Sequence, residues 1–282
     1  MNNPVLLTGL PRSGTTLVVK LLNDIPNVVA LNEPMPVMKM AGLGQSELYN
    51  WIDQYTAKSV EMLLTEKKAQ TKHIGGAFTD NSFNAAADEQ GLRSSRVMLG
   101  MIEITRELNN EFTLAIKHNG AFTAVAHHLV NRYRCFAVIR NPLSVLLSWQ
   151  TVNIPVNMGR MPVAEAVDPN LRKCLDEIGD TLDRQIFIVN WFFERFQKYF
   201  AGDHILRYEN LVSTGGRCLD KIIPNTEIVP NRLTSKNTNK IYKRDMTDMI
   251  AERLMSTGGA FIQFYDAADI ELIQSELNNF AG

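Results

Sequence analysis

The sequence predicts an α/β fold of three layers, in which helices cover both faces of a central, mainly parallel sheet of about five strands. Short apolar runs alternate with longer helical patterns along the chain, and this alternation is typical of a parallel sheet. The first apolar run also leads through a glycine-containing turn directly into a helix, as in many such sheets. With 282 residues, 45% of them apolar, the chain is long enough to bury a large core. We expect residues 1–282 to form a single domain.

Five short apolar runs have the length and hydrophobicity of buried strands. In chain order they are residues 4–8, 28–31, 112–116, 134–139 and 204–207. Parallel sheets bind their ligands at the carboxyl ends of the strands. The residues that follow each run are therefore the first candidates for a functional site.

Helical patterns fill most of the chain between these runs. In chain order, helices are expected at residues 14–23, 46–70, 94–109, 121–133, 143–150 and 171–200, the last with a break near Gly179. The two long patterns between the second and third strands make residues 36–110 a helical insertion.

The composition excludes several classes of protein. Lys and Arg number 29 against 30 Asp and Glu, a net charge of −1, so no overall basic field attracts nucleic acid or anionic lipid. Three widely spaced cysteines, Cys135, Cys174 and Cys218, form no CxxC pair and favour a reducing, cytoplasmic location. Neither a signal peptide nor an apolar run of membrane-spanning length is found.

The turn after the first strand has the spacing of a phosphate-binding loop. Gly9 and Gly14 are separated by four residues, and two threonines follow, as in G-x-x-x-x-G-K-[ST]. Thr15 stands at the position of the usual lysine, while Arg12 supplies a positive charge from inside the loop. The other predicted strands do not end in the aspartate that a nucleoside triphosphatase uses to hold magnesium. We expect an anion site without a metal, neutralised by Arg and Lys.

A second anion-binding pair follows the strand at 134–139. Arg140 ends this strand, and Ser148 lies eight residues further on, about two turns into the next helix. A cation and a hydroxyl placed in this way can hold one phosphate from two sides. A structural Arg–carboxylate pair and a Ser bonded to its own helix are the alternative.

These motifs together resemble the sulfotransferases that use 3′-phosphoadenosine 5′-phosphosulfate (PAPS). Residues 11–16 are similar to the family's 5′-phosphosulfate loop, and Arg140 with Ser148 to its 3′-phosphate signature. Tyr208, in Tyr-Glu-Asn-Leu, resembles a tyrosine that lies near the adenine. The resemblance extends from residue 4 to about 212. It implies PAPS as co-substrate, release of 3′-phosphoadenosine 5′-phosphate (PAP), and no metal. The nucleotide-binding residues it implies are Arg12, Ser13, Gly14, Thr15, Thr16, Arg140, Ser148 and Tyr208.

The resemblance also implies catalytic roles. Arg12 would stabilise the leaving phosphate by charge alone, since arginine does not donate a proton at neutral pH. Glu33 would be the base, because carbohydrate and tyrosyl-protein sulfotransferases place a glutamate after the second strand, and we expect a raised pKa for it. His118 is the other candidate base. Cytosolic relatives carry Lys-Thr-His here, but in Lys117-His118-Asn119 the histidine falls one place early.

The acceptor stays open: a carbohydrate, a lipid or polyketide alcohol, or a phenol. Residues 36–110 are expected to build its pocket, and residues 152–170 to form either a mobile loop over it or a plain surface connection. The basic stretch 236–244 either closes over the nucleotide or forms a solvated loop. The sequence does not predict the oligomeric state.

Two other classes of function are compatible with the sequence. One is a P-loop kinase for a small molecule, which would use ATP and magnesium. The absence of the usual lysine and aspartate is evidence against a kinase. A non-catalytic nucleotide-binding protein would bind PAP without turnover.

Overall fold

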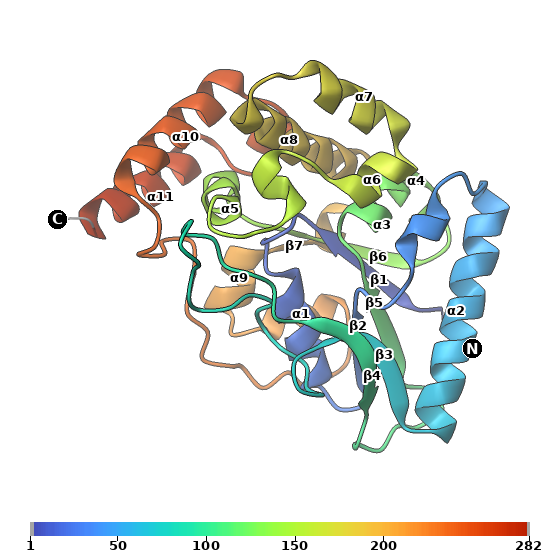
Figure 1. Ribbon diagram of the computed structural model, residues 1–282. Coiled ribbons are helices and arrows are strands. Elements are labelled where there is room, and N and C mark those ends of the chain that lie inside the picture. The colour runs from blue at the N-terminus through green and yellow to red at the C-terminus, as the bar shows by residue number, and fades with distance from the viewer. Residues whose placement is uncertain (1–2, 281–282) are drawn as a thin grey trace.

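A computed structural model describes residues 3–280 of the chain (Figure 1). Residues 1–2 and 281–282, which the predicted single domain includes, lie outside the described residues. In the part of the chain that is described, no helix is long and apolar enough to cross a membrane.

Within residues 3–280, five strands, all parallel, form the central sheet in the order β2-β5-β1-β6-β7. Their bounds are β1 Val5–Gly9, β2 Val28–Asn32, β5 Thr113–Lys117, β6 Arg134–Ile139 and β7 Ile205–Arg207. Each strand coincides within a residue or two with a predicted apolar run. The predicted α/β fold with a mainly parallel sheet is therefore confirmed.

Helices cover both faces of this sheet (Figure 1). Alternate strand residues face opposite sides: Leu7 of β1 belongs to one hydrophobic core, and Leu6 to the other. The first core also contains α1 and α9, while the second contains α3, α4, α5 and α8. The helices are α1 Thr15–Asn23, α2 Gln45–Thr65, α3 Gly120–Ala124, α4 Ala126–Leu129, α5 Pro142–Trp149, α6 Pro162–Val167, α7 Pro169–Glu177, α8 Thr181–Tyr199, α9 Tyr208–Ser213, α10 Arg244–Thr257 and α11 Ala267–Phe280. Shorter 3₁₀ turns are η1 Val37–Met40, η2 Pro155–Met158, η3 Gly202–His204, η4 Arg217–Lys221 and η5 Ala260–Gln263.

The predicted helix at 94–109 is wrong, because residues 98–103 form a strand. β4 (Met98–Glu103) pairs antiparallel with β3 (Lys68–His73) in a hairpin separate from the main sheet. Its apolar residues fit a helical or an extended pattern equally well, and pairing with β3 decides between them. The other long helix, α2, ends at Thr65, because Lys67 has a left-handed backbone with φ 53°. The segment 36–110 is thus a helix followed by a hairpin rather than a helical insertion.

Residues 152–170 form helical turns, where the sequence predicts a loop or a plain surface connection. They contain η2, α6 and the start of α7, and Val156, Met161 and Ala164 are buried. Asp168 caps α7 by accepting the Asn170 N–H and also accepts a hydrogen bond from the indole of Trp191. This segment is therefore packed into the core.

A buried asparagine fixes α1 to the edge strand of the sheet. The side chain of Asn23, 5% exposed, donates to the Ala30 carbonyl at 2.7 Å and accepts from the Ala30 N–H at 3.1 Å. Arg106 donates to the same side-chain oxygen at 2.8 Å. These bonds satisfy backbone groups on the edge of β2 that would otherwise be buried without partners.

Replacing Asn23 by Ala is expected to lower the free energy of unfolding by about 2 kcal/mol, because it leaves these buried backbone groups without hydrogen-bond partners. Urea denaturation measures the loss. The exposed Asn210→Ala variant serves as the control and should change stability by no more than about 0.5 kcal/mol. Equal stabilities of the two variants would contradict the assignment.

Candidate functional site

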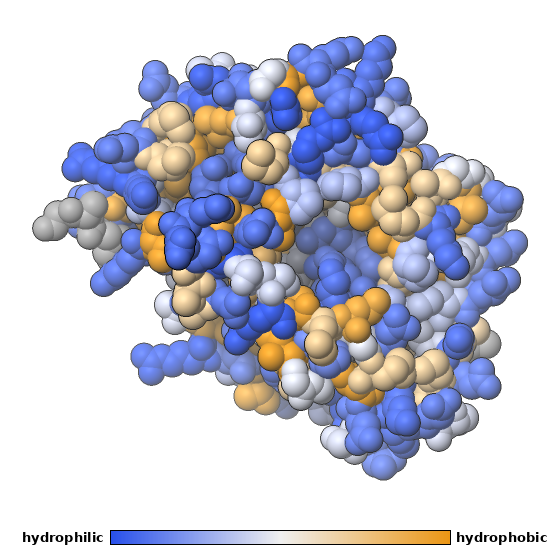
Figure 2. All heavy atoms as spheres, in the orientation of Figure 1, coloured by the Kyte–Doolittle hydropathy of each residue, from blue (hydrophilic) through white to orange (hydrophobic). Residues whose placement is uncertain are grey.

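A large cavity of about 750 Å³ opens at the carboxyl ends of the central strands. Figure 2 shows this face of the molecule hollowed near its centre, with hydrophilic residues inside the hollow. Eight Lys and Arg side chains line the cavity against two acids, although the chain as a whole has a net charge of −1. The cations are Arg12, Lys72, Arg93, Arg96, Lys117, Arg140, Arg232 and Lys236, and the acids are Glu33 and Asp80. The cavity is therefore suited to a ligand with several negative charges.

The loop after β1 forms an anion cradle at the start of α1. Gly14, with φ 96°, is the residue before the helix, and no side chain among the described residues caps this end. The first N–H groups of α1 are therefore available to an anion, and Thr15 and Thr16 both line the cavity. A Cβ at residue 14 would lie 2.7 Å from the ring of Tyr208. Glycine is needed here for its backbone conformation and for the close packing of that ring.

Ser13 is a predicted binding residue whose side chain faces away from the cavity. It is fully buried, and its hydroxyl donates to the Val138 carbonyl of β6 at 2.8 Å. Its side chain fixes the loop to the sheet.

Arg12 lies on the side of the loop that faces α5. Its Nε donates to the hydroxyl of Ser148 at 3.1 Å, and its guanidinium lies 4.6 Å from the ring centre of Phe83. Another nitrogen of the group donates to the Asn81 side chain at 3.3 Å. Burial, together with the nearby Arg140, lowers the pKa of Arg12 to about 10. The group is still charged at neutral pH.

Arg140 and Ser148 each contact Arg12 of this loop. Arg140 is 4% exposed, and it donates to the Arg12 carbonyl at 2.9 Å and to the Asn237 side chain at 2.7 Å. Its guanidinium lies 4.7 Å from the ring centre of Tyr208. Both Arg140 and Ser148 line the cavity. Neither alternative of the sequence analysis, an Arg–carboxylate pair or a Ser bonded to its own helix, is seen among their hydrogen bonds in the described residues.

Asn237 is a site residue that the sequence analysis missed. It is buried, and its amide donates to Glu209 at 2.8 Å while its side-chain oxygen accepts from Arg140. Glu209 also accepts the Asn141 N–H at 3.0 Å. The basic stretch 236–244 therefore contacts the site through Asn237, and Tyr242 in it lines the cavity, although most residues of the stretch are exposed. The only sequence signal for Asn237 was its place in that stretch.

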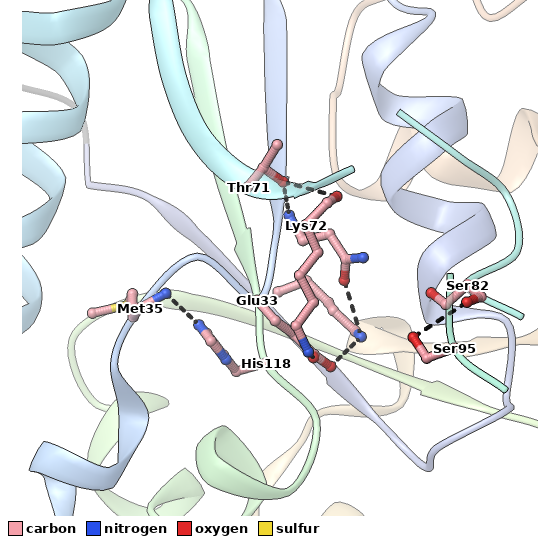
Figure 3. A network of polar contacts seen from close by, with 9 residues as sticks. Glu33, Met35, Thr71, Lys72, Ser82, Ser95 and His118 are labelled. Carbon is pink, nitrogen blue, oxygen red and sulfur yellow. Dashed lines mark hydrogen bonds and ion pairs between the residues drawn. The ribbon is translucent and has the colours of Figure 1, made fainter. Parts of the chain in front are cut away.

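Glu33 follows β2 directly, and ion pairs occupy both of its carboxylate oxygens (Figure 3). Its Oε1 is 2.7 Å from Nζ of Lys117, and its Oε2 is 2.5 Å from Nζ of Lys72. Burial by itself would raise the pKa of Glu33, but Lys117, Lys72 and the nearby His118 together hold that pKa well below its usual range. The expected raised pKa is therefore wrong, because the two lysines come from strands whose proximity the sequence does not reveal.

His118 follows β5 and is 3% exposed. Its Nε2 accepts the backbone N–H of Met35 at 3.1 Å (Figure 3). Its ring packs edge-on against Phe122. Burial lowers the pKa of His118 to about 3, with the charges of Lys117 and Lys72 acting against that of Glu33. The imidazole is thus neutral at pH 7, and its one basic nitrogen is occupied by the Met35 N–H.

The strand order divides the cavity into two halves. The loop half consists of the loop after β1 with Arg140, Ser148 and Tyr208, which follow β1, β6 and β7. The carboxylate half consists of Glu33, Lys72, Lys117 and His118, which follow or flank β2 and β5. Because β5 lies between β2 and β1, the two halves adjoin along one edge of the sheet.

Two further segments supply walls of the cavity. From residues 36–110 come Val37, Lys72 and part of the loop between β3 and β4, while α2 contributes no lining residue. Six residues between Ile154 and Val163, in or beside η2 and α6, form an apolar wall: Ile154, Pro155, Val156, Met161, Pro162 and Val163. Within residues 3–280 no group of three or more His, Cys, Asp or Glu could hold a metal ion.

Comparisons with known proteins give structural neighbours only. No protein-family model and no curated protein matches the sequence. A sulfotransferase from Alicyclobacillus acidocaldarius is 11% identical, with 98% of this chain and 96% of that chain covered and a TM-score of 0.45. A sulfotransferase from Mycobacterium tuberculosis is 13% identical, with 99% and 77% covered and a TM-score of 0.36. The function proposed below is therefore based on the residues of the cavity.

The His118 imidazole is expected to stay neutral, with its proton on Nδ1, down to about pH 4, because burial lowers its pKa to about 3. The ¹⁵N shifts of the ring, followed by NMR between pH 4 and 8, measure this. The same residue in urea is the control and should titrate near pH 6.5 as in a peptide. A midpoint near 6.5 in the folded protein would contradict the buried, neutral assignment.

Proposed function

We propose that the protein is a PAPS-dependent sulfotransferase, which moves a sulfuryl group from PAPS to a hydroxyl acceptor and releases PAP. An amine is the less favoured acceptor. The observation that supports this most strongly is the loop half of the cavity, where an anion cradle and the Arg140–Ser148 pair lie side by side.

The loop half fits a nucleotide with two separate anionic groups. In this proposal the N–H groups at the start of α1 hold the 5′-phosphosulfate, where the helix dipole favours negative charge. Arg140 and Ser148 hold the 3′-phosphate, since the Ser148 hydroxyl accepts from Arg12 and keeps its own proton to donate. Tyr208, packed on Gly14 and Arg140, offers a ring near which the adenine would lie.

Sulfuryl transfer is mainly a matter of position and charge. The acceptor oxygen forms a bond to sulfur as the bond from sulfur to the 5′-phosphate oxygen breaks, and the electron pair stays on that phosphate. Arg12 and the α1 N–H groups stabilise this charge. Arg12 acts only as a cation, because even its lowered pKa of about 10 keeps its proton in place.

Glu33 is the proposed base that takes the proton of the acceptor hydroxyl. It lines the cavity in the carboxylate half, next to the half that would hold the sulfuryl group. His118 is the weaker candidate, since its basic nitrogen accepts the Met35 N–H. Glu33 is ionised at neutral pH, but two ammonium groups weaken it as a base.

Two features of the cavity are evidence against a magnesium-dependent kinase. Thr15 stands where such a kinase has its lysine, and the Glu33 carboxylate is already paired with two ammonium groups. This set of donors suits a nucleotide whose phosphates are neutralised by side chains. A non-catalytic PAP-binding protein is the remaining alternative, and turnover with PAPS separates the two.

PAP is expected to raise the melting temperature of the protein by about 5 °C at a hundredfold excess over its Kd, because it binds only the folded state. AMP, which lacks the 3′-phosphate, and ATP with magnesium should raise it much less. Arg140→Gln should remove most of the PAP shift, while the exposed Arg172→Gln control keeps it.

A shift with ATP and magnesium that exceeds the PAP shift would overturn the proposal in favour of the kinase. A PAP shift that survives Arg140→Gln unchanged would contradict the assigned 3′-phosphate site. If the protein binds PAP but neither transfers sulfate from PAPS nor hydrolyses it, then it is a nucleotide-binding protein without a catalytic role.

A further inference from the structure

We propose that the acceptor is an anionic hydroxyl compound, whose negative group pairs with Lys72 and so releases Glu33 to take the hydroxyl proton. The inference rests on the proposed function and names its substrate class. Three observations support it: the place of Lys72 in the cavity, the unequal burial of the two lysines on Glu33, and the apolar residues that line the same cavity.

Lys72 lies at the end of the cavity remote from the loop half. It belongs to β3, which flanks β2 because the Asn32 N–H donates to the Thr71 hydroxyl at 2.8 Å. In the sheet, β5 and β1 separate β2 from β6, the strand that Arg140 follows. The nucleotide phosphates would be held in the loop half, so Lys72 is a cation in excess of those that the nucleotide uses. An anion on the second substrate is the natural partner for it.

The two lysines on Glu33 differ in how readily they can exchange partners. The side chain of Lys117 is 3% exposed and also donates to the Asn32 side chain at 3.3 Å. A buried ammonium of this kind is strongly destabilising without its carboxylate. The side chain of Lys72 is 37% exposed, and Glu33 is its ion-pair partner among the described residues. A partly exposed pair is weak, so an incoming anion can take Lys72 while Lys117 stays in place.

When Lys72 pairs with an incoming anion instead of Glu33, the chemistry of the Glu33 carboxylate changes. Glu33 Oε2 loses a charge-assisted hydrogen bond, and one of the positive charges that lower its proton affinity moves away. The acceptor hydroxyl can then donate to this oxygen. As the new oxygen–sulfur bond forms, the hydroxyl proton passes to Oε2, and the sulfur–phosphate oxygen bond breaks to release PAP. Only an acceptor with a suitably placed anion activates the base in this way, which makes Lys72 a specificity-determining residue.

The walls of the carboxylate half indicate that the rest of the acceptor is partly apolar. Val37 of η1 and Met161 and Val163 of the α6 region line the cavity, and η1 packs against α6. An aromatic or aliphatic body with a hydroxyl and an anion fits these surroundings.

Matched pairs of small phenols test the inference on the PAP-saturated protein. 4-Hydroxyphenylacetate and 4-hydroxyphenylacetamide have nearly the same shape and differ in charge. 4-Hydroxybenzylphosphonate and its dimethyl ester provide a second pair with a phosphate-like anion. This pair differs in charge and by two methyl groups, and it distinguishes a phosphate-like from a carboxylate source of negative charge. Calorimetric titration of each compound gives its Kd.

The variants are Lys72→Met and the control Lys68→Met. Lys68 lies four residues earlier on β3, on the same outward face, is exposed, and does not line the cavity. In the natural protein and in Lys68→Met, at least one anionic phenol should bind about tenfold more tightly than its neutral partner, as expected for a charge-assisted hydrogen bond. In Lys72→Met this preference should disappear. A Lys72→Gln variant replaces Lys72→Met if the latter no longer shows the PAP-induced rise in melting temperature.

Equal binding of both members of both pairs would overturn the inference, as would no binding of any of them. A preference for the anion that survives in the Lys72 variants would also overturn it. These failures are distinguishable from failure of the proposed function, because saturation with PAP is measured first. A protein that binds PAP but does not discriminate between charged and neutral phenols keeps the proposed function and loses only the substrate class.

Discussion

The parallel pairing of β1 with both of its neighbours is the constraint on which the site depends. Leu7 is in register with Lys117 of β5 on one side and with Phe136 of β6 on the other. Because all three strands run in the same direction, the loop after β1, His118 and Arg140 emerge at one edge of the sheet. The strands themselves are almost wholly buried, so burial on both faces, not any ligand, holds this edge in position. A rigid edge of this kind is what catalysis by positioning requires.

The second constraint is the positive charge that this edge collects. Lys117 is buried deeply enough that its ammonium must be paired, and Glu33 is the residue that pairs it. Glu33 therefore serves the fold as well as the proposed chemistry, and its backbone is held in a left-handed conformation, with φ 48°, by its N–H bond to the Lys117 carbonyl. A carboxylate that is paired with two ammonium groups is a weak base. An acceptor that displaces Lys72 would leave Glu33 paired with Lys117 and make it a stronger base.

The sequence predicted the parts of the site in which neighbouring residues act together. The loop before α1 and the Arg140–Ser148 pair each lie within one strand-to-helix connection, so their spacing along the chain is close to their spacing in the fold. The strands were predicted because buried parallel strands are continuous apolar runs. In contrast, β4 was mistaken for a helix, since its short pattern fits both structures until β3 pairs with it.

The parts of the site that could not be predicted from the sequence depend on contacts between distant segments of the chain. Lys72 reaches Glu33 across 39 positions, and Asn237 reaches Arg140 across 97. No periodicity or spacing marks such contacts. The error about the pKa of Glu33 has the same origin, because burial alone would have raised it and only the two lysines reverse the direction. Ser13 shows the converse, a residue inside a binding motif whose side chain serves packing.

A crystal structure of the protein with PAP would test whether one edge of the sheet is divided into a nucleotide half and an acceptor half. We expect the 5′-phosphate against the N–H groups of Gly14 and Thr15. We expect the 3′-phosphate between Arg140 and Ser148, with Glu33, Lys72 and Lys117 clear of the nucleotide. A nucleotide phosphate bound to Lys72 or Lys117, or a 3′-phosphate away from Arg140, would contradict that division.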